Sequence, residues 1–202
     1  MNNSKIFNPN RPELAPYGLT CELWKPQPLP RFDRHNEIEI NFFPKHGASY
    51  LISNRIIDIP PNRLVMFWAL TPHKTMTFPG KEEYYVCTIP LTSFLSWKVD
   101  ENMQHKLLHG EVLVAANEMT AEYDRHLLQM WHNNLSDDTH TMQETIMLEM
   151  KARLKRFAME YEQLEKNREQ SYSNENGKRF FLKMQISCHV SLCSSHRISI
   201  NR

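Results

Sequence analysis

The chain has 202 residues, of which 41% are hydrophobic and 23% are charged, so its composition is that of an ordinary globular protein. The 24 Lys and Arg residues nearly balance the 23 Asp and Glu residues, which argues against a dedicated nucleic-acid surface. Because residues 1–5 are polar, we expect no signal peptide. Because no apolar run is long enough, we expect no membrane span. The four cysteines form no C-x-x-C pair, so we expect a reduced, cytoplasmic setting.

Residues 1–30 are predicted to form an extended N-terminal arm. Proline fixes φ and removes a backbone donor, so a proline-rich stretch disfavours both helix and inner strand. The prolines concerned are Pro9, Pro12, Pro16, Pro26, Pro28 and Pro30. From these residues alone, a leader without a fixed place is the simplest interpretation of the arm.

The stretch that follows the arm alternates polar and apolar side chains. Ile38, Ile40 and Phe42 occupy even positions, whereas acids and a histidine occupy odd ones. The polar set consists of Asp33, His35, Glu37 and Glu39. A period of two is typical of a strand whose faces meet different environments, and in many antiparallel sheets the polar face simply meets water. Because these acids have no alternating basic partners, we instead interpret them as the wall of a small-molecule pocket.

Residues 31–116 are predicted to form one β-rich domain. Strands are expected at 37–43, 48–53, 55–59, 64–69, 83–89 and 111–115, with proline and glycine turn signals between them. Regular short strands favour a closed sheet over a parallel α/β fold. The run from Leu64 ends in His73 directly after Pro72, where the ends of strands line the mouth of a barrel. Trp68 in that run either stacks on a ligand or packs in the core.

Residues 117–167 are predicted to be helical. A short helix or loop at 94–97 precedes them, Thr120 is a candidate N-cap, and a second helix is expected to start at 136–138. The second helix carries an apolar stripe that packs either on its own domain or on a second copy of the chain. The stripe consists of Ile146, Met150, Leu154, Phe157 and Tyr161. The neighbouring basic residues Lys151, Arg153, Lys155 and Arg156 are interpreted as the solvated face.

Residues 168–202 are predicted to be a linker and a disordered, truncated tail, because they show neither a helical period nor caps. Cys188, Cys193 and His196 follow a C-x4-C-x2-H spacing that matches no common zinc site.

Several uncommon tripeptides in this chain resemble the sensor half of AraC-type transcription regulators. They occur in the right order in the blocks 50–54, 64–73 (ending in FWALTPH), 89–97, 109–110 and 154–157, and the resemblance covers roughly residues 30–165. It implies an α+β, mainly β fold, in which a cupin-like β-barrel is followed by two amphipathic helices. It also implies an effector-sensing and dimerisation module in which the stripe joins a homodimer. The arm would then either fold over the bound sugar or reach the partner module. DNA would be held by a C-terminal helix-turn-helix domain, which residues 168–202 do not resemble.

The resemblance further implies a sugar effector, without a metal or another cofactor, in a protein that is not an enzyme. A sugar needs hydrogen-bonding groups for its hydroxyls and an aromatic face for its C–H surface. The predicted ligand-binding residues are Asp33, His35, Glu37, Glu39, Trp68 and His73.

The alternative is a metal-dependent cupin enzyme, an isomerase or a dioxygenase. Cupins often carry an H-x-H-x3-E motif and a distal histidine, which His35, Glu39 and His73 match. Asp33 replaces the first histidine of that motif, and no glycine precedes His73.

Overall fold

The computed structural model describes residues 4–135 and 141–167. The chain divides into two compact units, Met1–Tyr161 and Glu162–Arg202, and the first unit contains the β domain and nearly all of the described helices. The expected helix start at 136–138 and the expected tail at 168–202 lie outside the described residues.

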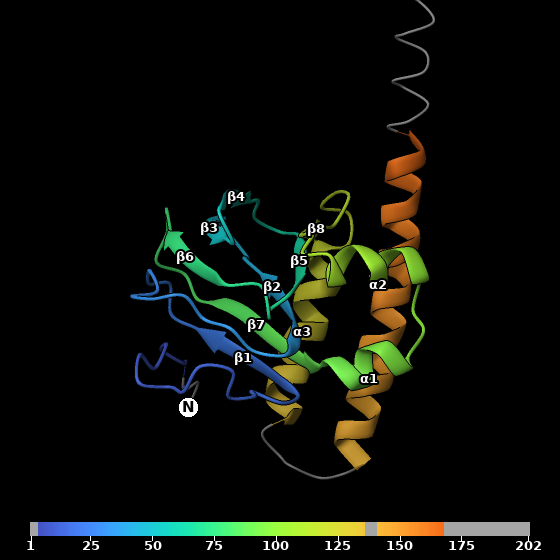
Figure 1. Cartoon of the computed structure of the whole chain (residues 1–202). Coiled ribbons are helices and arrows are strands. Elements are labelled where there is room, and N and C mark those ends of the chain that lie inside the picture. Colours follow the sequence, from blue (N-terminus) through green and yellow to red (C-terminus); the bar gives the residue numbers. More distant parts are fainter. Residues whose placement is uncertain (1–3, 136–140, 168–202) are drawn as a thin grey trace, which may run out of the picture. The chain divides into compact units, whose positions relative to one another are not determined.

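The described strands form two antiparallel sheets (Figure 1). The five-stranded sheet has the order β1-β7-β2-β5-β8, and the three-stranded sheet has the order β4-β3-β6. The strands are β1 (Thr20–Trp24), β2 (Glu37–Phe42), β3 (Ala48–Ile52), β4 (Arg55–Ile59), β5 (Leu64–Trp68), β6 (His73–Thr77), β7 (Tyr84–Pro90) and β8 (Leu113–Val114). The α+β class is therefore confirmed as two antiparallel sheets followed by helices, and the closed, cupin-like barrel stays a prediction.

Two of these strands were not predicted. β1 lies inside the proline-rich arm, but it fits between Pro16 and Pro26 and occupies an edge of its sheet, where neighbouring prolines are tolerated. β6 has the sequence HKTMT, which lacks the apolar alternation that identifies a strand.

A corner formed by residues 29–37 connects the two sheets. Asp33 and His73 form an isolated antiparallel bridge, in which the Asp33 N–H donates to the His73 carbonyl at 2.8 Å and the His73 N–H donates back at 3.1 Å. The Leu29 N–H donates to the Thr75 carbonyl at 3.0 Å. Asp33 therefore lies next to β6 of one sheet while it leads directly into β2 of the other.

Helices cover the face of the five-stranded sheet that points away from β3, β4 and β6 (Figure 1). They are α1 (Leu91–Ser96), α2 (Glu101–Leu108), α3 (Ala121–Leu135) and a helix over residues 141–167, of which 141–161 belong to the first unit. The Asp100 side chain caps α2 by accepting a hydrogen bond from the Met103 N–H at 2.7 Å. The described helices include none that combines the length and apolar character needed to cross a membrane.

The apolar stripe of the last helix packs inward and so corrects our prediction of a dimer surface. Ile146, Met150, Leu154 and Phe157 are at most 2% exposed and lie in one cluster with strands β2 and β7, while Tyr161 packs partly buried against the same cluster. Burial of these side chains in their own domain leaves none of the four for contact with a second copy.

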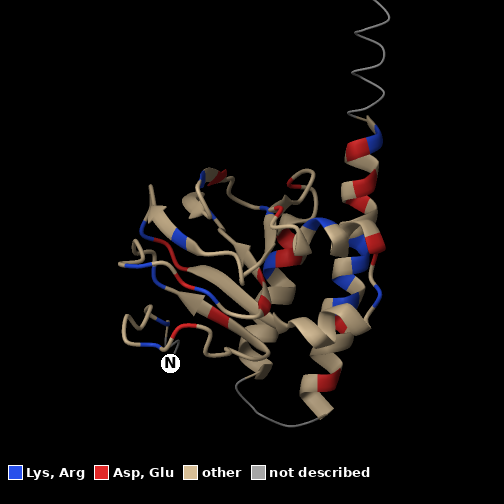
Figure 2. Cartoon of the chain, viewed as in Figure 1, with Lys and Arg blue, Asp and Glu red and all other residues tan. Residues whose placement is uncertain are grey.

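Arg153 also differs from its predicted place on a solvated face. It is 1% exposed and donates from Nη2 to Asp124 of α3 at 3.1 Å, with a second bond from Nε to the same carboxylate. A buried guanidinium needs such a partner, so this pair ties the last helix to α3. Figure 2 shows basic and acidic positions interspersed along this helix.

A second apolar cluster fills the space between the two sheets. It includes Phe43, Tyr50, Ile52, Val65, Phe67, Tyr84 and Val86. The five-stranded sheet is thus buried on both faces, and every residue of β2 is buried. Ile38, Ile40 and Phe42 point to the helices, so Glu37 and Glu39 point into the space between the sheets.

Candidate functional site

Five of the six predicted ligand-binding residues are buried together at the corner between the sheets. The exposed fractions are 4% for Asp33, 0% for His35, 2% for Glu37, 7% for Glu39 and 3% for His73. Charged side chains are rarely this buried without partners, so their contacts decide what the cluster can do.

The His35 ring, just before strand β2, lies between the carboxylates of Glu37 and Glu39. Its Nδ1 is 2.9 Å from Glu37 Oε2, and its Nε2 is 3.0 Å from Glu39 Oε2. A neutral imidazole has one N–H and can donate to one carboxylate, whereas the protonated ring donates to both. Burial of the ring lowers the pKa of His35, but the hydrogen bonds to the two carboxylates outweigh it and raise that pKa to about 9.

Glu39 is the point where several side chains meet. Besides the His35 ring, its carboxylate accepts from Asn41 Nδ2 at 2.9 Å and lies 3.6 Å from His73 Nε2. Burial of Glu39 raises its pKa, but the contacts with the two histidines prevail and hold that pKa well below its usual range. The other nitrogen of His73, Nδ1, is 2.9 Å from the Thr71 carbonyl, which fixes the direction of this ring.

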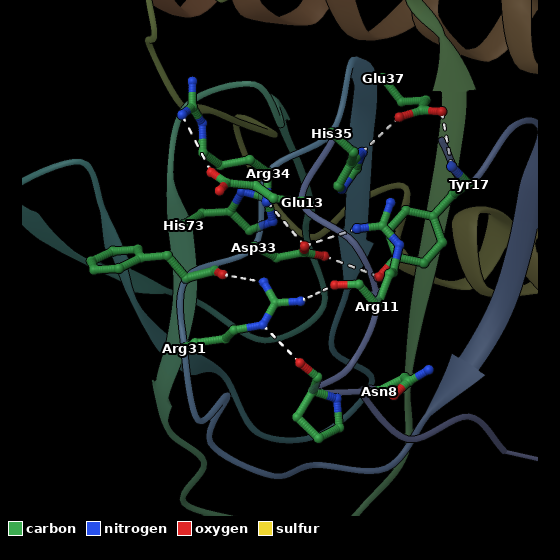
Figure 3. A network of polar contacts seen from close by, with 12 residues as sticks. Asn8, Arg11, Glu13, Tyr17, Arg31, Asp33, Arg34, His35, Glu37 and His73 are labelled. Atoms are coloured by element: carbon green, nitrogen blue, oxygen red, sulfur yellow. Dashed lines mark hydrogen bonds and ion pairs between the residues drawn. The ribbon is translucent and has the colours of Figure 1, made fainter. Parts of the chain in front are cut away.

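The arm supplies the partners of Asp33. Arg11 Nη1 donates to Asp33 Oδ1 at 2.9 Å, the Tyr17 hydroxyl donates to Asp33 Oδ2 at 3.0 Å, and the Arg11 guanidinium lies 3.7 Å from the centre of the Tyr17 ring (Figure 3). Burial and the Asp33 charge raise the pKa of Tyr17, so this hydroxyl stays protonated and donates. The arm thus neutralises one of the three buried carboxylates.

The arm is also held by main-chain groups. The N–H groups of Tyr17 and Gly18 both donate to Glu37 Oε1 at 3.0 Å. Gly18 has φ of +78°, a left-handed conformation that suits glycine and lets both N–H groups point at one oxygen. Further along, the Arg31 guanidinium donates to the carbonyls of Pro9, Arg11 and Phe32 and holds the loop of the arm closed (Figure 3).

A cavity lies beneath the arm, between the two sheets. It is lined by Phe7, Tyr17, Thr20, Glu22, Trp24, Leu29, Asp33, Glu39, Tyr50, His73, Thr75, Tyr84, Val86 and Thr88. Its volume is about 30 Å³. One water molecule needs roughly 10–15 Å³ of such space, so the closed cavity has room for a few waters and no more.

Trp68 is the predicted site residue that the structure places elsewhere. It packs against the helix-side cluster, and its Nε1 donates to Asn36 Oδ1 at 3.2 Å, so its ring does not reach the cavity. Its neighbour Phe67 points between the sheets instead, because side chains alternate along β5. The aromatic lining comes from Phe7, Tyr17, Trp24, Tyr50 and Tyr84, which the sequence analysis did not single out.

Three residues of this cluster are of types that bind metal ions. Asp33, His35 and His73 each offer a ligand atom within 4.8 Å of the others. However, both oxygens of Asp33 are bonded to Arg11 or Tyr17, and both ring nitrogens of His35 are bonded to glutamates. The Arg11 guanidinium also places a positive charge beside this group, which disfavours a cation there. The donor set therefore does not fit a metal while the arm is closed.

Comparison with known proteins shows distant homology to AraC-type transcription regulators over the N-terminal 70% of the chain. The relatives found are the Melibiose operon regulatory proteins of Escherichia coli K12 and of Escherichia coli O6:H1, each 24% identical over 142 residues. The match covers 46% of each relative, so the chain spans about half the length of the curated relatives it matches. The predicted resemblance is thereby confirmed as a distant one.

No family model matches the chain. Among solved structures, the AraC-like transcriptional activator CuxR aligns with a TM-score of 0.38 and 12% identity, over 59% of this chain and 42% of that one. A likeness at this level carries no argument about fold or function.

Proposed function

We propose that this chain senses a small effector on behalf of an AraC-type transcription regulator, and that the effector binds between the two sheets beneath the arm. Homology to operon regulators over 142 residues supports the class of protein. The observation that carries the position of the site is a buried group of carboxylates and imidazoles that borders a cavity and is covered by the arm.

We propose a sugar as the effector, and an α-galactoside first, because the relatives regulate a melibiose operon. The carboxylates of Asp33 and Glu39 would accept hydrogen bonds from sugar hydroxyls, and the rings of Trp24 and Tyr84 at the cavity would cover its C–H surface.

Effector binding requires the arm to move. A cavity of about 30 Å³ is far below the roughly 300–1,000 Å³ of ordinary ligand pockets, and Phe7, Tyr17 and Leu29 of the arm form part of its wall. A sugar that binds the open arrangement better shifts the population toward it, since a ligand moves an equilibrium through its difference in affinity. The arm is then the element that reports the effector.

We propose that the sensing region pairs as a homodimer through a face other than the predicted stripe. Met119, Tyr123 and Met159 are exposed by 90%, 47% and 70% and border a groove of about 730 Å³ beside α3. Exposed apolar side chains gathered around one groove mark an interaction surface. Contact with DNA would belong to a helix-turn-helix domain, as in other AraC-type proteins, and the setting would be the cytoplasm.

The test is a ligand screen by thermal shift, followed by calorimetric titration with melibiose and with other α- and β-linked disaccharides. We expect melibiose or another sugar to stabilise the chain, and Glu39→Gln to weaken that binding at least about tenfold, which corresponds to the loss of one charge-assisted hydrogen bond. Glu13→Gln, in an exposed ion pair of the same arm, is the matched control and should bind normally. A chain that binds no sugar would refute the proposed effector class.

Metal analysis separates this function from the metal-dependent enzyme. Stoichiometric Zn, Mn or Fe in the purified protein that disappears in His73→Ala would favour the enzyme. Sugar binding that persists after treatment with a chelator would favour the sensor.

A further inference from the structure

Two cysteines face each other across the outermost strand pair of the five-stranded sheet. Cys21 of β1 is the direct antiparallel partner of Cys87 of β7. Both thiols are free and buried, at 2% and 0% exposed, and their sulfur atoms are 2.8 Å apart. Nothing in the effector site uses this pair, because it lies on the helix side of the sheet.

The backbone already has the spacing that a disulfide requires. Directly opposed residues of an antiparallel pair have Cα atoms roughly 4.5–5.5 Å apart, within the range of about 4.4–6.8 Å found for disulfides. The sulfur atoms need to approach by less than about 1 Å to reach the bonded distance of roughly 2.05 Å. A bond between Cys21 and Cys87 therefore needs side-chain rotation and no rearrangement of the strands.

The same environment keeps the thiols unreactive while the domain is closed. Burial and the neighbouring Cys21 raise the pKa of Cys87 well above its usual value, so the reactive thiolate is scarce. Cys21 Sγ lies 3.4 Å from the Leu128 carbonyl of α3, and His132 Nδ1 of the same helix is 3.0 Å from the Cys21 carbonyl. Because α3 contacts Cys21 on this side of the sheet, a local opening of α3 away from β1 would expose the pair to an oxidant.

We propose that Cys21 and Cys87 are an oxidation site, at which a peroxide converts the two thiols into a disulfide that fastens β1 to β7. One thiol loses its proton, the thiolate attacks an oxygen of hydrogen peroxide, and the O–O bond breaks. The departing hydroxide takes up that proton, so a sulfenic acid and water form. The second thiol then loses its proton, its thiolate attacks the sulfenic sulfur, the S–O bond breaks, and the departing hydroxide leaves as a second water. The two sulfur atoms together lose two electrons, which the peroxide takes up.

The disulfide would act on the arm through β1, and this consequence rests on the proposed function. Gly18, which holds Glu37, is joined to β7 by the Thr88 hydroxyl, which donates to the Gly18 carbonyl at 2.8 Å. Thr20 and Thr88 are also within 2.7 Å through their hydroxyls. A covalent bond one residue further along makes the separation of β1 from β7 impossible, so the base of the arm stays fixed. The oxidised chain would therefore open its arm less often.

The experiment uses the full chain with Cys188→Ser and Cys193→Ser in every sample, so that only the two buried thiols remain. Hydrogen peroxide is titrated onto the folded protein, and the products are alkylated, digested without reductant and identified by mass spectrometry. Amide hydrogen exchange at residues 17–24 is measured before and after oxidation and again after dithiothreitol. The controls are Cys21→Ala and Cys87→Ala, each checked for folding by circular dichroism.

We expect an intact mass lower by two hydrogen atoms, a peptide linked through Cys21 and Cys87, and exchange at Tyr17 and Gly18 at least about tenfold slower until reductant is added. Thiols that stay alkylatable in the peroxide-treated folded chain would overturn the oxidation site. A linked peptide without any change in exchange at residues 17–24 would overturn its effect on the arm. Neither measurement uses an effector. Both can therefore be interpreted even if the chain binds no sugar. If an alanine variant fails to fold, reversal by dithiothreitol of the link in the chain that keeps both Cys21 and Cys87 still decides the question.

Discussion

The two faces of strand β2 are built from different chemistry, although both are buried. Toward the helices the strand presents Ile38, Ile40 and Phe42, each at most 3% exposed and packed among apolar neighbours. Toward the other sheet it presents Glu37 and Glu39, whose carboxylates are held by imidazoles, an amide and the arm.

This difference separates what stabilises the domain from what makes it specific. Each apolar side chain buried on the helix side contributes roughly 1.5–3 kcal/mol of transfer free energy. Buried charges lose their hydration free energy, and only well-placed partners offset that loss. A polar interior therefore adds little net stability. The buried carboxylates add little stability, and some of their hydrogen-bond partners come from the arm. Such carboxylates are suited to exchanging the arm for a ligand.

The largest effect is expected from truncation on the helix side. Phe42→Ala should lower the free energy of unfolding by about 3–5 kcal/mol, since Phe42 is 0% exposed and its removal leaves a cavity in the larger core. Urea denaturation followed by circular dichroism measures this loss. Phe42→Leu is the matched control and should lose clearly less. If both variants lost the same free energy of unfolding, the volume of the side chain removed would not be the cause of the loss.

The second effect is a pH dependence that arises on the polar side. The pKa of His35 rises from 6.5 in the unfolded chain to about 9 in the folded one, so its contribution is complete below pH 6.5 and is lost as the pH rises through 9. The loss amounts to at most about 3 kcal/mol, measured by urea denaturation between pH 6 and pH 9.5. Glu37 and Glu39, whose pKa values are lowered, act in the opposite sense and only on the acid side.

His35→Gln should flatten this dependence, because the amide does not titrate. If the free energy of unfolding of that variant still fell between pH 6.5 and 9, the pH dependence would belong to another titratable group.

The contrast between the two faces could be predicted from sequence, because it follows from a period of two. The expected strands at 37–43, 48–53, 55–59, 64–69 and 83–89 each overlap an observed one, and the polar set from Asp33 to Glu39 does point inward. The local pattern identifies which residues share a face. Whether the polar face meets water or a second sheet depends on contacts far apart in the chain.

The missed features all depend on such distant contacts. Arg11 and Tyr17 belong to a segment whose prolines suggested an unfixed leader, and their role appears only when the chain brings Asp33 beside them. Trp68 was one register position away from the space between the sheets, which Phe67 occupies instead. The helix stripe fitted two partners equally well by its period, and tertiary packing selected the chain's own core.

The third prediction tests whether the arm depends on the polar face. Asp33→Asn removes the charge that holds Arg11 and Tyr17, so closure of the arm should weaken by about 1–3 kcal/mol with a smaller loss in global stability. Hydrogen exchange of residues 8–18 and limited proteolysis of the arm measure the closure. Unchanged exchange in the variant would mean that Glu37 and Arg31 hold the arm without Asp33.

The smallest effect is expected from an exposed ion pair of the arm. Arg34 Nη1 lies 3.4 Å from Glu13 Oε1, but the two side chains are 38% and 62% exposed, whereas the side chains of Arg11 and Asp33 are 11% and 5% exposed. Water screens the exposed pair, so Glu13→Gln should change arm closure by no more than about 0.5 kcal/mol in the same exchange experiment. A loss as large as that of Asp33→Asn would show that charge anywhere on the arm holds it closed. The buried cluster would then have no special part in the closing of the arm over the cavity.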